Sequence, residues 1–221
     1  MAKISIDPIG KLLGLRHKSH PWHGVEIGEN APDELTCFVE MVPTDTVKYE
    51  IDKTTGYLTI DRPQKFSSIL PALYGFIPQT YCGKRVGGYS AKALNNPDII
   101  GDGDPLDVCI LTEKDVAHGD VLARAIPIGG FKMIDGNQAD DKIIAVLKDD
   151  ALYSHYKDIS EIPETVVNRL KHYFLTYKQM PGEVSQSCEI SQIYNKEQAH
   201  ELINLAMDDY REYIERMMFE K

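Results

Sequence analysis

The sequence predicts a single α+β domain spanning residues 1–221, and three patterns support this prediction. Apolar and polar residues alternate as in strands from residue 35 onward, whereas two amphipathic helical patterns lie near the C-terminus. No strand–helix–strand repeat, which would indicate a parallel sheet, connects them. With 221 residues, of which 43% are hydrophobic, the chain can bury the core of one large domain.

Residues 1–34 precede the first strand-like segment and are interpreted as an N-terminal arm. Its most distinctive part is the run His20-Pro21-Trp22-His23. Two histidines are too few for a structural zinc site, which takes four ligands. We therefore favour a structural role, in which Trp22 anchors the arm onto the domain through its large apolar surface.

Short strands are expected to follow the arm, because apolar residues recur at every second position between turn residues. Lys48 and Glu50 should share one face of their strand, since side chains two residues apart point the same way. The connection 76–101 is interpreted as a long insertion loop, which is uncommon in a compact domain. The expected strands are residues 38–42, 47–52, 57–60, 106–111, 121–128 and 142–148.

Two helices are expected at the end of the chain. Residues 166–177 carry apolar side chains at three- and four-residue steps behind Pro163, and residues 199–217 carry the same pattern. Asn195 precedes the second helix, with Gln198 in the position of a capping box. Strands followed by helices are typical of α+β domains.

The charge and the cysteines exclude several classes of protein. A net charge of −10 argues against nucleic acid as a partner, because phosphate backbones require a basic face. No apolar run approaches the about 20 residues of a membrane-spanning helix, and the first residues lack a signal-peptide core. The four cysteines are scattered without a CxxC pair. We therefore predict a cytoplasmic protein with free thiols.

The segment 101–108, GDGDPLDV, is the most informative part of the sequence. Asp102, Asp104 and Asp107 place three carboxylates within six residues. Carboxylates this close repel one another unless cations neutralise them, and Mg²⁺ prefers such oxygen ligands. An EF-hand loop starting at Asp102 would place Leu106 at the fifth and Asp107 at the sixth position, where a ligand and a glycine are required. A calcium-binding EF-hand is therefore excluded.

A second acidic segment contains Asp135 and Asp140-Asp141. Taken alone, it is more typical of a solvated turn. Basic and phenolic residues are interspersed with both acidic segments, although each alone is more often a surface charge or a core residue. Carboxylates for metal ions together with Lys, Arg and Tyr donors describe a site for a highly charged phosphate. The donors are Lys48, Arg62, Lys142, Tyr177 and Lys178.

These segments resemble those of a known family. The segment 102–108 is similar to the signature of the family I soluble inorganic pyrophosphatases, and other segments match that family in order and spacing over roughly residues 20–180. Agreement of so many motifs in order is highly specific. The matching residues are Glu40, Lys48-Tyr49-Glu50, Gly56, Arg62, Tyr74-Gly75, Lys132-Met133, Asp135, Asp140, Lys142 and Tyr177-Lys178.

The resemblance implies a small, distorted, OB-like closed β-barrel with helices packed outside it. It also implies hydrolysis of pyrophosphate to two phosphates by a homo-oligomeric enzyme with several Mg²⁺ ions, for which Mn²⁺ or Zn²⁺ can substitute. The implied metal ligands are Asp102, Asp107 (bridging two ions), Asp140, Asp135 and Glu50, with Glu40 orienting water behind them. Asp104 is the implied general base, assisted in catalysis by Tyr74, Arg62 and Lys178. The implied phosphate-binding residues are Lys48, Arg62, Tyr74, Lys142, Tyr177 and Lys178.

Two positions depart from the family pattern. Leu70 stands where many bacterial members have a tyrosine, and Gly136 where an acidic residue often follows the equivalent of Asp135. The 76–101 connection carries Tyr81 and Tyr89, and we hypothesise that one of them supplies the missing hydroxyl. The alternative is that the connection is a tolerated surface insertion.

Two other functions fit part of the sequence. Asp102-Gly103-Asp104 satisfies the DxD pattern of metal-dependent nucleotide-sugar transferases, but that pattern is short and no doubly wound nucleotide-binding half is visible. A non-catalytic module that binds divalent ions would explain the carboxylates. It would leave Lys142, Tyr177 and Lys178 without a role, and an assay of phosphate release separates the two.

Overall fold

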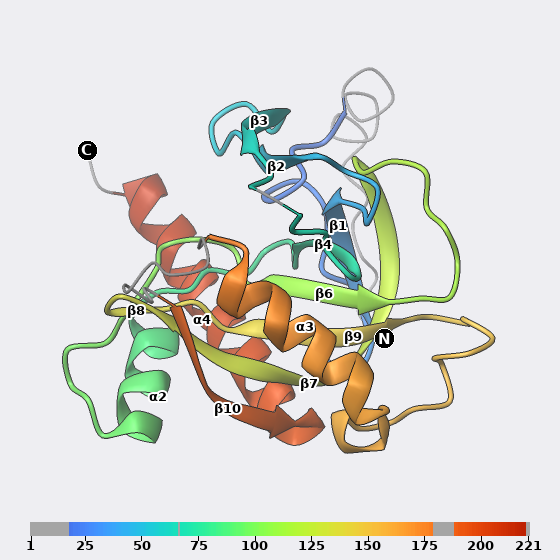
Figure 1. The fold of residues 1–221 in the computed structure, drawn as a ribbon. Helices are drawn as coiled ribbons and strands as arrows, with labels where there is room; N and C mark the ends of the chain where they lie inside the picture. The colour runs from blue at the N-terminus through green and yellow to red at the C-terminus, as the bar shows by residue number, and fades with distance from the viewer. Residues whose placement is uncertain (1–17, 66, 179–187, 220–221) are drawn as a thin grey trace.

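A computed structural model describes residues 18–65, 67–178 and 188–219 (Figure 1). The architecture is α+β, as predicted, and no helix in these residues is long and apolar enough to cross a membrane. In chain order the elements are β1 (Leu35–Met41), β2 (Val47–Ile51), β3 (Leu58–Pro63), β4 (Leu73–Phe76), α2 (Lys84–Leu94), β5 (Ile100–Gly101), β6 (Asp107–Leu111), β7 (Val121–Asp135), β8 (Gln138–Ala139), β9 (Lys142–Leu147), the 3-10 helix η1 (Ile159–Glu161), α3 (Glu164–Thr176), β10 (Cys188–Asn195) and α4 (Lys196–Phe219).

The long strand β7 organises the main sheet. Its first residues pair with β1 and its middle pairs with β9, so that the path β1–β4–β6–β9–β7 returns to β1. A register shift between Pro127 and Gly129 marks a bulge, which bends a strand and increases its twist. Beyond this bend β7 pairs with β10 and β8. The ribbon formed by β2 and β3 is a separate sheet.

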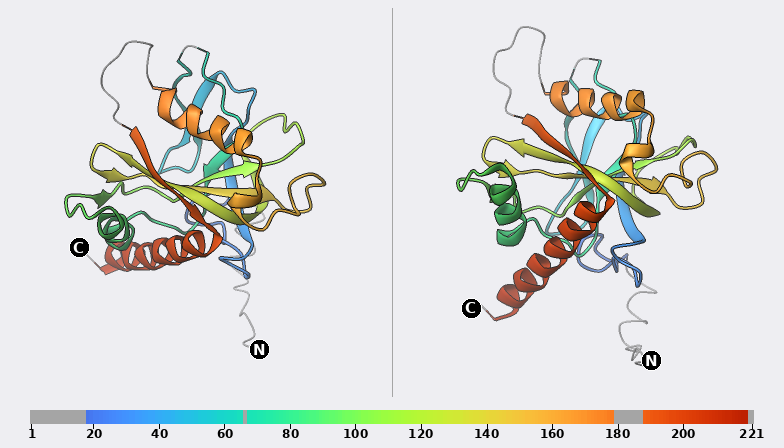
Figure 2. Two further views of the ribbon diagram at one scale, coloured as in Figure 1. Left: turned by 60° about the horizontal axis from the view of Figure 1, so that its bottom comes forward. Right: turned by 90° about the horizontal axis from the view of Figure 1, so that it is seen from below.

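The main sheet separates two apolar cores, because alternate side chains of β7 point to opposite faces. Phe131 and Met133 pack against Phe174 and other residues of α3 on one face. Ile134 packs on the other face, in the core that contains Leu202 of α4. Figure 2 shows this division, with α3 on one side of the sheet and α2 and α4 on the other.

The predicted anchor and both predicted C-terminal helices are confirmed. The Trp22 side chain is 2% exposed, and its indole nitrogen donates a hydrogen bond to the Thr80 carbonyl at 2.8 Å. Residues 1–17 of the predicted arm lie outside the described residues. α3 follows Pro163, and the Asn195 side chain accepts a hydrogen bond from the Gln198 amide at 3.1 Å, which caps α4.

Strand β10 was not predicted, and β7 extends well beyond the predicted 121–128. β10 runs antiparallel to β7 over residues 188–195. Its sequence, CEISQIYN, breaks the alternation of apolar and polar residues at Ser191-Gln192, and only Cys188 and Tyr194 within it are fully buried. Pairing with a distant strand stabilises it, and local sequence carries little sign of such pairing.

The interpretation of 76–101 as a long loop was wrong, because this connection contains α2 and β5. Two consecutive glycines weaken the helical signal. The helix is stabilised from outside: the carboxylate of Asp209 in α4 accepts hydrogen bonds from the amides of Gly83 at 3.1 Å, Arg85 at 2.9 Å and Val86 at 3.1 Å. These amides would otherwise lack partners at a helix N-terminus.

Alanine substitutions at the two glycines of α2 are expected to change the stability of the protein in opposite directions. A Cβ on Gly87 would lie 2.4 Å from the backbone nitrogen of Gly101, whereas one on Gly88 would meet nothing within 4 Å. We expect Gly87→Ala to destabilise the protein by about 1–3 kcal/mol through overpacking, and Gly88→Ala to stabilise it by about 0.5–1 kcal/mol through helix propensity. Urea denaturation measures both. If the two substitutions changed the free energy of unfolding equally, this would contradict the close packing of α2 on β5.

Candidate active site

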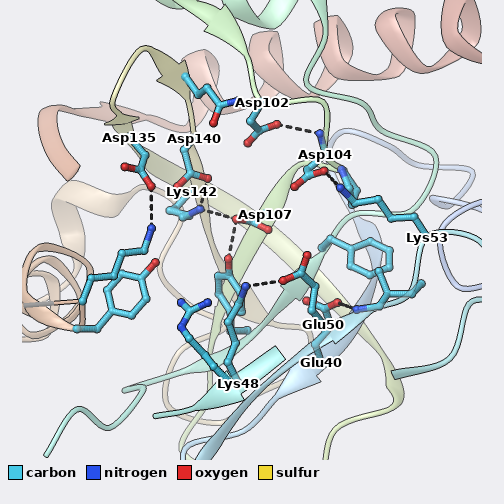
Figure 3. Close-up of a pocket in the computed structure, with 18 residues that line it drawn as sticks. Glu40, Lys48, Glu50, Lys53, Asp102, Asp104, Asp107, Asp135, Asp140 and Lys142 are labelled. Carbon is cyan, nitrogen blue, oxygen red and sulfur yellow. Dashed lines mark hydrogen bonds and ion pairs between the residues drawn. The ribbon is translucent and has the colours of Figure 1, made fainter. Parts of the chain in front are cut away.

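One polar pocket lies where the main sheet, the β2–β3 ribbon and the end of α3 meet (Figure 3). Seven carboxyl groups and five basic side chains line it, so its acidic residues outnumber the cations beside them. The carboxyl groups belong to Glu40, Glu50, Asp102, Asp104, Asp107, Asp135 and Asp140, and the basic groups to Lys48, Lys53, Arg62, Lys142 and Lys178.

The loop between β5 and β6 presents Asp102 and Asp104 to this pocket. Gly103 adopts a φ of 81°, which favours glycine over residues with a Cβ. The Gly103 amide donates to the Cys82 carbonyl at 3.0 Å, and the Cys82 amide donates to the Asp104 carbonyl at 2.8 Å. Asp102 accepts a hydrogen bond from the Asp104 amide at 2.9 Å. These bonds fix the turn between the two carboxylates.

Lys142 connects the two acidic segments. The parallel pairing of β6 and β9 places it beside Asp107, and its ammonium group donates hydrogen bonds to both Asp107 and Asp140. The Tyr74 hydroxyl donates to the same oxygen of Asp107 at 2.6 Å. Burial alone would lower the pKa of Lys142, but the two carboxylates outweigh burial and raise this pKa well above its ordinary value.

The remaining basic residues each contact a carboxylate of the pocket or its rim. Lys178 lies 2.7 Å from Asp135. It lines the pocket just beyond the end of α3, together with Tyr177. Lys48 lies 2.7 Å from Glu50, on the shared strand face that the sequence predicts. Since these ion pairs are partly exposed, we assign them little stabilisation.

Two carboxyl groups, the buried Glu40 and the half-buried Asp102, have insufficient positive charge around them. Burial raises the pKa of Asp102 to about 8 and that of Glu40 to about 8. The Glu40 side chain is held below the ribbon by a hydrogen bond from the Ile51 amide at 2.8 Å. Such carboxyl groups become fully ionised at neutral pH only when additional cations approach.

The donors of this pocket fit hard divalent cations, which prefer carboxylate oxygen. Within the described residues no three His, Cys, Asp or Glu side chains converge closely enough to hold a metal ion. Instead, the Lys142 ammonium group lies between Asp107 and Asp140. In this arrangement Lys142 neutralises part of the negative charge of both carboxylates.

The free energy of unfolding of the metal-free protein is expected to fall as the pH rises from about 5 to about 9. The pKa of Glu40 is about 8 in the fold and 4.5 ordinarily, so the folded chain retains a proton that the unfolded chain releases. In EDTA, the melting temperature at about pH 9 should be at least about 4 °C lower than that at about pH 5. Glu40→Gln should reduce this decrease, and an identical decrease in both proteins would contradict the assignment.

Comparisons with known proteins identify the family. The model of the inorganic pyrophosphatase family matches residues 37–211. The chain belongs to the inorganic pyrophosphatase family. An inorganic pyrophosphatase from Chlamydia trachomatis serovar L2 is 50% identical over 196 residues, covering 87% of this chain and 94% of that protein. A soluble inorganic pyrophosphatase from Oryza sativa subsp. indica is 38% identical over 196 residues, covering 89% and 81%.

Solved structures of pyrophosphatases share the fold. The crystal structure of inorganic pyrophosphatase from Thermus thermophilus matches with a TM-score of 0.72 at 25% identity, covering 87% of this chain and 99% of that one. That from Ehrlichia chaffeensis matches with a TM-score of 0.64 at 32% identity, covering 82% and 98%. The membership in the pyrophosphatase family that the sequence predicts is thus confirmed.

Every site residue selected from the sequence lines this pocket of the pyrophosphatase. Two polar lining residues were not expected from the sequence: Lys53, which pairs with Asp104, and Gln138 of β8, which lies between Asp135 and Asp140 in the chain. Lys53 lies in the turn after β2, where a lysine is ordinarily a surface charge. Asp61 was also missed, and it lies 3.2 Å from Lys48 at the rim.

Two interpretations need correction, and Leu70 itself does not line the pocket. Leu70 is 1% exposed and packs in the core beside α3. Neither Tyr81 nor Tyr89 lines the pocket: Tyr81 stacks on Tyr213 with ring centroids 4.6 Å apart, and Tyr89 donates to Glu201 at 3.2 Å. The proposed replacement of a hydroxyl was therefore wrong. The segment around Asp141 is no solvated turn, since the Asp141 side chain is fully buried.

Proposed function

We propose that this pyrophosphatase hydrolyses inorganic pyrophosphate to two phosphates in a reaction that depends on Mg²⁺. The observation that carries this proposal is the pocket that seven carboxyl groups and five basic side chains line together. Carboxylates alone would repel a pyrophosphate anion, and basic residues alone would not explain the acidic excess. Both sets have a use when metal ions and a polyanion bind together.

The carboxylates of Asp102, Asp107 and Asp140 would hold the resident ions, and Asp135 and Glu50 would hold ions that arrive with the substrate. When bound, such ions neutralise phosphate oxygens and lower the pKa of water toward neutrality. Mg²⁺ is the favoured ion, with Mn²⁺ or Zn²⁺ as substitutes. Glu40, buried behind Asp107 and Glu50, would orient water in the site.

Asp104 would accept the proton of the attacking water. Its side chain is 41% exposed at the open side of the pocket, where substrate and water can reach it. A carboxylate that removes a proton as the bond to phosphorus forms typically contributes about 10²–10⁴-fold to the rate.

The opposite wall would bind the phosphates. Arg62 lies 6.0 Å from the ring centre of Tyr177, and the ammonium group of Lys178 lies 5.4 Å from the same ring. Two cations and a phenol at one end of the pocket suit the leaving phosphate, whose charge increases as the bond breaks. Lys48, Tyr74 and Lys142 would bind the remaining phosphate oxygens.

Three further properties belong to this proposal. We infer that the ring of strands β1, β4, β6, β9 and β7 is the small OB-like barrel that the family resemblance implies, supported by its closed path of pairings. A cytoplasmic location and a homo-oligomeric assembly rest on the same resemblance. Light scattering tests the assembly against the 24.9 kDa mass of one chain.

The proposal predicts that phosphate release from pyrophosphate requires a divalent ion. Purified protein should stop releasing phosphate in EDTA and recover in excess Mg²⁺, whereas Ca²⁺, which is larger and less demanding in geometry, should restore little. A nucleotide-sugar substrate should not be consumed. Undiminished turnover in chelator would refute the metal dependence, and ion binding without any turnover would favour a non-catalytic module.

A further inference from the structure

Three polar side chains form a buried cluster on the face of the sheet opposite the pocket. The Lys132 ammonium group donates to the Ser90 hydroxyl at 3.1 Å and lies 3.4 Å from Asp141. The Ser90 hydroxyl donates to the other carboxylate oxygen of Asp141 at 3.2 Å. The side chains of Lys132 and Asp141 are 1% and 0% exposed, and Ser90 is equally buried.

Aromatic rings enclose the ammonium group of this cluster. It lies 4.6 Å from the ring centre of Tyr89 and 5.6 Å from that of Tyr194, where the negative faces of the rings attract a cation. Gly130 makes room for Tyr194, because a Cβ there would lie 2.4 Å from the phenol ring. Residues of α2, β7 and β10, and Asp141 between β8 and β9, thus meet around one charge.

Such a cluster needs an explanation other than stability. Removing two charges from water costs free energy that their mutual attraction barely offsets, and well-packed apolar replacements of buried ion pairs are often neutral or stabilising. None of the three residues lines the pocket. A role in holding other residues in place therefore accounts for the cluster better than a contribution to stability.

The position of Asp141 in the chain indicates which residues it holds. Asp140 and Lys142 flank it, and both line the pocket. Because side chains alternate along extended backbone, Asp140 and Lys142 point to the pocket while Asp141 points to the opposite face. The Asp140 amide also donates to the Met133 carbonyl at 2.9 Å, next to Lys132. Fixing Asp141 to Lys132 and Ser90 therefore fixes both flanking residues.

We propose that Ser90, Lys132 and Asp141 are positioning residues that hold Asp140 and Lys142 in the geometry the reaction needs, and that α2 is coupled to the active site through Ser90. This inference depends on the proposed roles of Asp140 in binding metal ions and of Lys142 in binding phosphate. Partners behind a metal ligand typically affect metal affinity or activity about 10–100-fold.

The test replaces the ion pair without leaving a buried charge. In Lys132→Met/Asp141→Leu both partners become apolar, so the melting temperature should stay within about 5 °C of wild type. We expect kcat/KM for pyrophosphate to fall about 10–100-fold, and calorimetric affinity of the substrate-free protein for Mg²⁺ to fall at least about 10-fold. Tyr89→Phe is the matched control, because it keeps the ring beside Lys132 and removes only a hydroxyl that contacts α4. It should match wild type in both measurements.

Ser90→Ala tests the same coupling through a small change. It removes one hydroxyl from the cluster and should weaken Mg²⁺ binding about threefold, as the loss of one hydrogen bond would. This variant decides the outcome if the double variant does not fold. Wild-type Mg²⁺ affinity in a folded double variant, or in Ser90→Ala, would overturn the proposal. Failure of wild-type protein to hydrolyse pyrophosphate would refute the proposed function instead, while the Mg²⁺ titrations would still test the positioning.

Discussion

Replacing Asp107 with asparagine is expected to lower kcat for pyrophosphate hydrolysis by about 10³-fold or more. Asp107 occupies the centre of the pocket in Figure 3 and contacts Lys142 and Tyr74 through one oxygen. It belongs to the first acidic segment, and its register opposite Lys142 places it beside the second, so that its charge serves both. Asparagine keeps the shape of the side chain but removes this charge, and with it the strongest attraction for cations at the centre of the site.

The effect of this substitution is separable from damage to the fold. Asp107 is partly exposed, and asparagine can still accept a hydrogen bond from the Tyr74 hydroxyl. The melting temperature of Asp107→Asn in EDTA should therefore differ from wild type by only a few degrees. Asp98→Asn is the control, because Asp98 is exposed and lies outside the pocket. A loss below tenfold in Asp107→Asn would contradict its central role.

Sequence analysis could find the residues of the pocket because the two acidic segments are short. Asp102, Asp104 and Asp107 lie within six residues, and the two-residue spacing of Asp140 and Lys142 directs both to one side of the extended chain. What joins the segments is the parallel pairing of β6 with β9, which depends on the whole sheet. The resemblance to a family supplied this link where spacing alone could not.

The parts that sequence analysis missed depend on contacts between distant residues. α2 is capped by Asp209 of α4, 124 positions from Arg85, and glycines lower its intrinsic helix propensity. A sequence does not reveal that Asp141 faces Lys132 rather than solvent, because this depends on which face of the sheet the helices α2 and α4 cover. Lys53 was missed for the opposite reason, since it is exposed and resembles any surface lysine.

Replacing Asp104 with asparagine is expected to lower kcat by about 10²–10⁴-fold, the range typical of general base catalysis. Asparagine preserves the size of the side chain and the loop hydrogen bonds, which run through the backbone of Asp104, but it cannot accept a proton. The affinity for Mg²⁺ should change little, because the proposed metal ligands are other carboxylates. Steady-state rates from about pH 6 to about pH 9, with Mg²⁺ titrations, measure both quantities.

Lys53→Met distinguishes the proposed role of the Asp104 carboxylate as a base from the role of its ion pair with Lys53. Lys53 pairs with Asp104, but the two side chains are 44% and 41% exposed, so this pair contributes at most about 1 kcal/mol. Removing the lysine leaves the carboxylate able to accept a proton, and we expect kcat to change less than about tenfold. If Lys53→Met lowered kcat as much as Asp104→Asn, the essential feature would be the ion pair that joins the turn after β2 to the β5–β6 loop.

If Asp104→Asn kept wild-type rates across this pH range, another group would have to accept the proton. The exposed position of Asp104 would then serve access to the pocket rather than the chemistry.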